Sequence, residues 1–115
     1  MTDDRCDHEH GARPLTLSSD GVLERGAAML RAMGDPSRLR LLERLSAGGA
    51  HCVSELADAA GVGMSTVSQR LRLLRDAHLV RRRREGKHVY YELADDHVGE
   101  LVRAALDHAA EGSHA

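Results

Sequence analysis

The chain has 115 residues, a formal net charge of −2, and 30% charged against 42% hydrophobic side chains, a composition typical of one soluble domain. It contains two Tyr and neither Phe nor Trp, which argues against a protein that stacks unpaired bases on aromatic side chains. No apolar run approaches the roughly 20 residues of a membrane span, and the polar start of the chain is not a signal peptide. We therefore expect a cytoplasmic protein in which Cys6 and Cys52 remain reduced.

The first third of the chain predicts a polar arm followed by two helices. Residues 1–20 lack hydrophobic periodicity, and we expect them to form a flexible N-terminal arm. From Asp20, apolar residues recur at helical spacing until Gly34, which predicts the first helix. Asp35 is expected to cap a second helix, which starts at Pro36 and stops at a pair of glycines.

The next segment has the spacing of a helix-turn-helix. Ser54 is expected to open a third, short helix that ends at Gly61, and Ser65 to cap a fourth helix. Ala57, Gly61 and Val67 supply the small residue, the turn glycine and the buried aliphatic residue that this motif needs.

Two segments rich in Val and Tyr, residues 79–83 and 88–93, are predicted strands joined by a turn at residues 85–87. A last helix is predicted over roughly residues 96–110. A helix-turn-helix followed by a β-hairpin is a winged helix. The predicted fold is therefore mainly α with a small β-hairpin, forming one DNA-binding and dimerisation domain over residues 21–112.

The small net charge hides a strongly basic segment. Residues 64–90 contain seven Arg and one Lys against two carboxylates, a net charge of +6, and the remainder of the chain carries −8. This segment covers the predicted fourth helix and hairpin, so it predicts binding to double-stranded DNA. Alternate arginines in the first strand point to opposite faces, so not all of them reach DNA at once. The candidate DNA-contacting residues are Ser65, Thr66, Ser68, Gln69, Arg70, Arg72, Arg75, Arg82, Arg84, Lys87 and His88.

The last helix carries two histidines that predict a metal site between subunits. His97 and His108 are eleven residues apart, so they project from one face about 16 Å apart along the axis, too far to share an ion. In an antiparallel pair of these helices, Asp95 and His97 of one copy meet His108 and Glu111 of the other. Two imidazoles and two carboxylates make a tetrahedral set suited to Zn(II). The alternative is a set of polar surface residues on an acidic helix.

From about Leu23 to Glu111, the sequence resembles the ArsR/SmtB family of bacterial metal-sensing transcriptional repressors, and in particular its zinc-sensing branch. The segment His51-Cys52-Val53-Ser54-Glu55-Leu56 is similar to the metal-box segment of that family, and Gly86-Lys87-His88-Val89-Tyr90-Tyr91 is similar to its wing. The C-terminal helix site of the family is reproduced by four residues, Asp95, His97, His108 and Glu111.

This resemblance implies a homodimer whose first and last helices form the interface. It also implies that the metal-free dimer represses a metal efflux or storage gene by binding operator DNA. Zn(II), or else Co(II), Cd(II), Pb(II) or Ni(II), would release the DNA, with His108 relaying to the backbone carbonyl of His78. The resemblance predicts neither a membrane partner nor a small organic substrate.

The resemblance also implies a second metal site, in which the arm of one subunit reaches the third helix of the other. Its candidate ligands are Cys6, His8, His10, Cys52 and Glu55. Ser54 stands where many cadmium, lead or arsenic sensors carry a second cysteine, and the alternative is a disordered arm beside a buried Cys52.

Two other functions remain open at this point. One is a redox-sensing repressor that uses its two cysteines, and the other is a metal-independent DNA-binding protein. An enzyme is not expected, because four protein ligands would leave a zinc ion no open position for a substrate.

Overall fold

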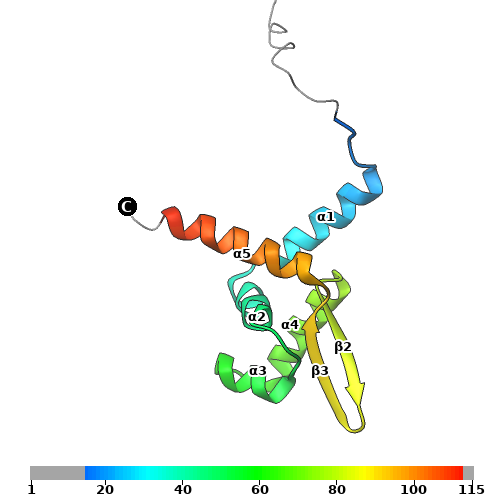
Figure 1. Cartoon of the computed structure of the whole chain (residues 1–115). Coiled ribbons are helices and arrows are strands. Elements are labelled where there is room, and N and C mark those ends of the chain that lie inside the picture. Colours follow the sequence, from blue (N-terminus) through cyan, green and yellow to red (C-terminus); the bar gives the residue numbers. More distant parts are fainter. Residues whose placement is uncertain (1–14, 113–115) are drawn as a thin grey trace, which may run out of the picture.

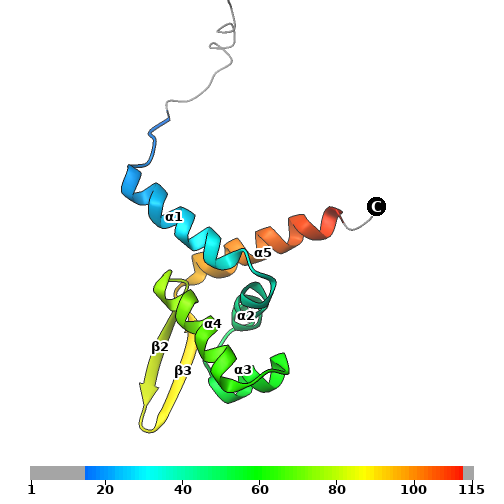
Figure 2. The same ribbon diagram turned by 180° about the vertical axis from the view of Figure 1, so that it is seen from behind.

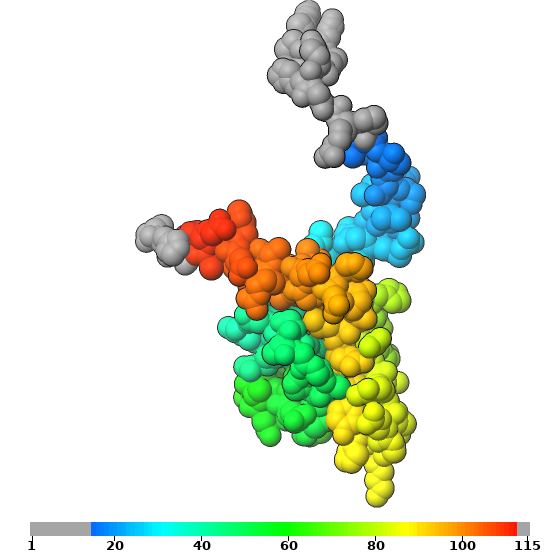
Figure 3. All heavy atoms as spheres, viewed as in Figure 1, coloured from blue at the N-terminus to red at the C-terminus, as the bar shows by residue number. Residues whose placement is uncertain are grey.

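The computed structural model describes residues 15–112, and the candidate ligands Cys6, His8 and His10 lie outside this range. The described elements follow in the order α1 (Asp20–Met33), α2 (Pro36–Ser46), β1 (His51–Cys52), α3 (Val53–Ala60), α4 (Met64–Asp76), β2 (Val80–Glu85), β3 (His88–Leu93) and α5 (Asp96–Glu111). Helices α2, α3 and α4 form a body beside the β2–β3 hairpin, and α5 crosses it at one end (Figure 1). The far ends of α1 and α5 extend away from this body (Figure 3).

The first two helices are both capped by side chains, one of which the sequence predicts. Ser19 caps α1, where its Oγ accepts the backbone N–H of Val22 at 3.2 Å. Asp35 caps α2 as predicted, and its Oδ2 accepts the backbone N–H groups of Ser37 and Arg38, each at 3.1 Å. Helix α2 ends at Ser46, two residues before the first of the glycines that were expected to stop it.

The helix-turn-helix is confirmed, with corrections to both of its helix starts. Helix α3 begins at Val53, so Ser54 lies inside it, and the N-cap is Cys52, whose extended backbone (φ −84°, ψ 162°) enters the helix. Ser65 does not cap α4, because Gly63 holds the extended cap conformation (φ −72°, ψ 159°) and Ser65 is already helical. The turn glycine behaves as expected: Gly61 has φ +70°.

The hairpin is longer than predicted, and it belongs to a three-stranded antiparallel sheet of order β1-β3-β2. Strand β2 covers Val80–Glu85 instead of residues 79–83, and Glu85 pairs with His88 across a two-residue turn in which Gly86 has φ +61°. Strand β1 was not predicted. It is only two residues long and pairs with Tyr90 and Tyr91 of β3.

The core lies where α2, α3, α4, the base of the hairpin and the first half of α5 meet (Figure 2). Its most deeply buried side chains are Leu41, Leu42, Leu45, Leu56, Val67, Leu71, Leu74, Leu79 and Val102. Burial of these residues holds α4 against the rest of the body and leaves its opposite face in solvent. Within residues 15–112, no helix has the length and apolar character needed to cross a membrane.

Candidate nucleic-acid interface and metal ligands

Helix α4 exposes the polar face that the sequence assigns to DNA. Val67, Leu71 and Leu74 are buried on one side, and this fixes which side of α4 faces solvent. The side chains exposed there include Ser65, Thr66, Ser68, Gln69 and Arg72. Arg70 and Arg75 are half-buried at the flanks. The first two turns of α4 therefore offer hydroxyl and amide groups, as a helix that reads base edges requires.

The basic residues of the wing differ in their partners. Arg81 donates from Nε to Oε2 of Glu92 at 2.7 Å, and Arg83 lies 3.6 Å from Glu85 and 5.9 Å from the ring centre of Tyr90. The remaining basic residues of the wing, which include Arg82, Arg84 and Lys87, have no ion-pair partner among residues 15–112, and all are exposed.

The predicted metal ligands form two half-sites at the two ends of α5. At the start, Nδ1 of His97 is 3.6 Å from Oδ1 of Asp95, and this same oxygen accepts the backbone N–H of Val98 at 3.2 Å. At the end, Nδ1 of His108 is 3.7 Å from Oε1 of Glu111. Both histidine side chains are 89% exposed, so each half-site faces solvent.

One chain does not bring the two half-sites together. Among the described residues, no group of three or more His, Cys, Asp or Glu side chains is arranged to hold a metal ion. This result agrees with the eleven-residue spacing of the two histidines, which places the half-sites about 16 Å apart along α5.

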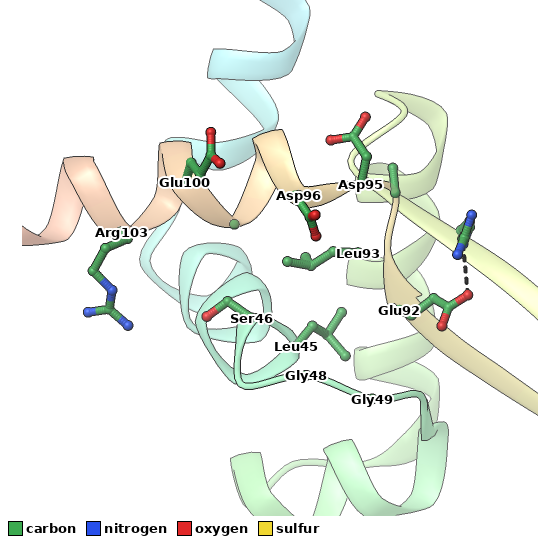
Figure 4. A pocket seen from close by; sticks show the side chains of 13 residues that line it. Leu45, Ser46, Gly48, Gly49, Glu92, Leu93, Asp95, Asp96, Glu100 and Arg103 are labelled. Carbon is green, nitrogen blue, oxygen red and sulfur yellow. Dashed lines mark hydrogen bonds and ion pairs between the residues drawn. The ribbon is translucent and has the colours of Figure 1, made fainter.

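The side chains of Asp95 and Asp96, adjacent in the chain, point in different directions. A pocket lies between the end of α2, the base of β3 and the first turns of α5 (Figure 4). The side chain of Asp96 points into this pocket, whereas the carboxylate of Asp95 points away from it. Asp96 is therefore a matched control for experiments on Asp95. Sequence reasoning did not find this pocket, because it depends on the packing of three elements distant in sequence.

The start of α3 brings together the two described candidates for the second metal site. The Cys52 thiol is half-buried, and its Sγ lies 3.3 Å from Oε1 of Glu55 and 3.2 Å from Oγ of Ser54. The backbone N–H of Cys52 also donates to Oε1 of Glu55 at 3.0 Å. This backbone hydrogen bond, followed by that of the thiol, lowers the pKa of the Glu55 carboxyl below its ordinary value.

His78 occupies the turn between α4 and β2. Its φ of +63° is left-handed, and the only described residues with positive φ besides it are glycines. The N–H of His78 donates to the carbonyl of Arg75, and the N–H of Leu79 donates to that of Leu74, both at 2.9 Å. These two bonds form a Schellman ending for α4. Within the described part of one chain, no hydrogen bond joins His108 to the His78 carbonyl, and the relay stays a prediction.

The fold and the basic surface define a winged helix-turn-helix DNA-binding protein. Residues 33–83 match the model of a helix-turn-helix domain. The chain is 46% identical over 99 residues to the transcriptional repressor SmtB homolog of Synechocystis sp., covering 86% of this chain and 74% of that protein. It is 38% identical over 85 residues to the cadmium resistance transcriptional regulatory protein CadC homolog of Staphylococcus aureus, covering 74% and 70%.

A solved structure is similar as well. The homodimeric winged helix-turn-helix domain of Mb0332 from Mycobacterium bovis aligns with a TM-score of 0.76 at 31% identity, covering 85% of this chain and 93% of that one. The protein belongs to the ArsR/SmtB family of metal-sensing transcriptional repressors. This membership confirms the predicted fold class and the expectation of a transcriptional regulator instead of an enzyme.

Proposed function

We propose that this protein is a Zn(II)-responsive repressor of the bacterial cytoplasm. The metal-free homodimer binds operator DNA, and Zn(II) bound at two sites between the subunits releases it, so that metal efflux or storage genes are transcribed. The observation that carries the proposal is the pair of exposed histidine–carboxylate half-sites at opposite ends of α5.

A second copy of the chain explains the apolar surface of the two projecting helices. On α1, Val22, Leu23 and Leu30 are 46%, 61% and 60% exposed, and on α5 Leu101 is 38% exposed. Several exposed apolar side chains on two projecting helices are typical of a surface that a partner covers. The homodimeric state of the Mb0332 domain supports the same conclusion.

The position of Leu101 connects dimerisation with metal binding. His97, Leu101, Ala104 and His108 are spaced by four, three and four residues, so they share one face of α5. The centre of this face is apolar, and its ends carry the half-sites. An antiparallel copy of α5 that covers the centre therefore brings each half-site against the opposite half-site of its partner.

The donor groups of the half-sites fit Zn(II). Each full site would combine two imidazole nitrogens with two carboxylate oxygens, a set that zinc accepts in tetrahedral geometry. Asp95 uses one oxygen as the N-cap of α5, which leaves its second oxygen for a metal. A bound ion would supply a rigid link between the two α5 helices. Co(II), Cd(II), Pb(II) and Ni(II) are the alternative effectors, and each can replace Zn(II) in the DNA-release assay described below.

A short series of backbone hydrogen bonds joins α5 to α4, the recognition helix of the helix-turn-helix. The N–H of Ala94, two residues before α5, donates to the carbonyl of Leu79 at 3.0 Å, and the N–H of Leu79 donates to the carbonyl of Leu74 in α4. The peptide groups of Leu79 thus tie the start of α5 to the end of α4. A change in the angle between the two α5 helices would move the two copies of α4 and alter their spacing.

The test measures DNA binding by fluorescence anisotropy, on an operator duplex that the metal-free protein selects from a random library. We expect Zn(II) to weaken binding by about 5- to 150-fold, the usual range for coupled sites. H97A and H108A should bind the duplex normally without metal and lose the response to Zn(II), whereas D96N should keep it. Release of H97A or H108A by Zn(II) at wild-type concentration would contradict the proposal.

A second metal site at the start of α3 is supported by the approach of the Cys52 thiol to Glu55 at 3.3 Å. Cys6, His8 and His10 of the partner subunit's arm would complete it. A Co(II) titration tests this site separately, because sulfur-to-cobalt charge transfer should appear in the wild type and vanish in C52A. Release by peroxide without any response to Zn(II) would instead favour a redox sensor that uses the two cysteines.

A further inference from the structure

The two faces of the β2–β3 hairpin carry different chemistry. Side chains alternate between the faces of a strand, and directly paired residues share a face. Three cross-strand pairs lie on the inner face, which continues the core at Val80: Val80 with Leu93, Arg82 with Tyr91, and Arg84 with Val89. The other three lie on the outer face: Arg81 with Glu92, Arg83 with Tyr90, and Glu85 with His88.

The outer face neutralises its own charges. Arg81 and Glu92 form an ion pair of 2.7 Å, in which the Glu92 side chain is only 20% exposed. Arg83 lies between Glu85 at 3.6 Å and the Tyr90 ring at 5.9 Å. Two arginines of this face thus lie beside two glutamates, Arg81 beside Glu92 of the neighbouring strand and Arg83 beside Glu85 of its own strand. A phosphate that approached this face would compete with carboxylates already in place.

The inner face presents its arginines without such partners. Arg82 and Arg84 lie opposite Tyr91 and Val89, and no Asp or Glu of the described residues forms an ion pair with either. Val80 on the same face is buried, so the base of this face packs into the core, and β2 runs beside α4 (Figure 2). Beyond this base, Arg82 and Arg84 are exposed, so they add two unpaired positive charges to the strand that neighbours α4.

We infer that the four consecutive arginines of the wing divide by face into two roles. Arg82 and Arg84 neutralise DNA phosphates. Arg81 and Arg83 are positioning residues, which link β2 to β3 through Glu92 and Tyr90. They neutralise no DNA phosphate. This inference rests on the DNA-binding half of the proposed function and assigns its residues.

The salt dependence of binding separates the two roles. Each phosphate that a cationic side chain neutralises adds about 0.9 to the slope of log K against log salt concentration. In the metal-free dimer, with a random-sequence duplex of about 30 base pairs, R82Q and R84Q should each lower the slope per subunit by about 1. The matched variants R81Q and R83Q remove the same charge one residue away, and they should leave the slope unchanged.

A charge swap tests the positioning role directly. In the double variant R81E/E92R, the ion pair is reversed across the strands and the net charge is preserved. A positioning pair should tolerate this exchange, so the double variant should regain the affinity that R81E alone loses, with the wild-type slope. A residue that contacts phosphate would not be rescued, because its position would then carry a negative charge.

Two results would overturn the inference: equal loss of slope in R81Q and R82Q, or failure of E92R to rescue R81E while the double variant keeps the wild-type unfolding midpoint. Both require that the wild type binds the duplex. A wild type that binds no duplex at any salt concentration would instead refute the proposed function, and the inference with it.

Discussion

The metal sites proposed for α5 make a sharp prediction about mixed dimers. In a homodimer of H97A, both sites lose the ligand at the start of α5, and in a homodimer of H108A both lose the ligand at its end. In a heterodimer of the two variants, one site lacks both histidines. The other site takes His97 from one subunit and His108 from its partner, and it is intact. Two variants that each lack an intact α5 metal site should therefore form a heterodimer with one intact site.

The expected magnitude follows from the geometry of α5. Because the half-sites of one chain lie about 16 Å apart, each site must combine halves of two chains. At the α5 sites, a purified heterodimer should then bind one metal ion tightly, against two for the wild type. An unfractionated random mixture contains about half heterodimers, so it should regain about a quarter of the wild-type sites.

The assay is a Co(II) titration of dimers co-expressed with two different affinity tags, followed by the visible absorption of tetrahedral Co(II). The double variant H97A/H108A, paired with the wild type, is the control, because each of its sites lacks one histidine. A heterodimer of H97A and H108A that binds no more Co(II) than either homodimer would refute the antiparallel arrangement, even if Zn(II) releases the wild type from DNA.

Two further predictions concern the stability of the fold. H78G should raise the free energy of unfolding by up to about 1 kcal/mol at equal protein concentration in urea, because glycine adopts the φ of +63° without the cost that a Cβ brings; H88G, in a strand, should lower it. Equal losses in both variants would contradict this reasoning. The pKa of Asp35 is lowered, first by the Ser37 hydroxyl and then by the Arg38 backbone N–H, so it stabilises the fold above its ordinary pKa of about 4. That stability is lost as the pH falls below about 4, so thermal unfolding of D35N, which keeps a capping side chain, should depend less on pH there than that of the wild type or of the control D58N.

The local parts of the fold could be predicted because each has a local signature. The bounds of α1 follow from apolar spacing and Gly34, and the start of α2 follows from Asp35 and Pro36. The predicted starts of α3 and α4 were wrong, because Ser54 was expected to open α3 and Ser65 to cap α4. A cap is decided by backbone conformation as well as by residue type.

The candidate metal ligands were likewise predicted where a local pattern exists and left open where packing decides. The spacing of His97 and His108 placed them on one face of α5, and the structure shows each beside its expected carboxylate. Spacing did not distinguish Asp95 from Asp96, and only the family resemblance did. In the structure, Asp96 points into the pocket beside α2, a consequence of packing that no local pattern contains.

The sequence by itself determined a winged helix-turn-helix with a basic segment and two half-sites, because periodicity, capping and charge act within a few residues of the chain. Tertiary structure decided the rest. Strand β1 exists only because His51 and Cys52 meet Tyr91 and Tyr90 of β3, 38 or more residues further along the chain. The sequence already named Arg82 and Arg84 as candidates for DNA, but only the strand register showed that Arg81 and Arg83 meet carboxylates. Pairing between distant segments depends on packing the whole core, so four consecutive arginines in a sequence do not reveal the partners of each.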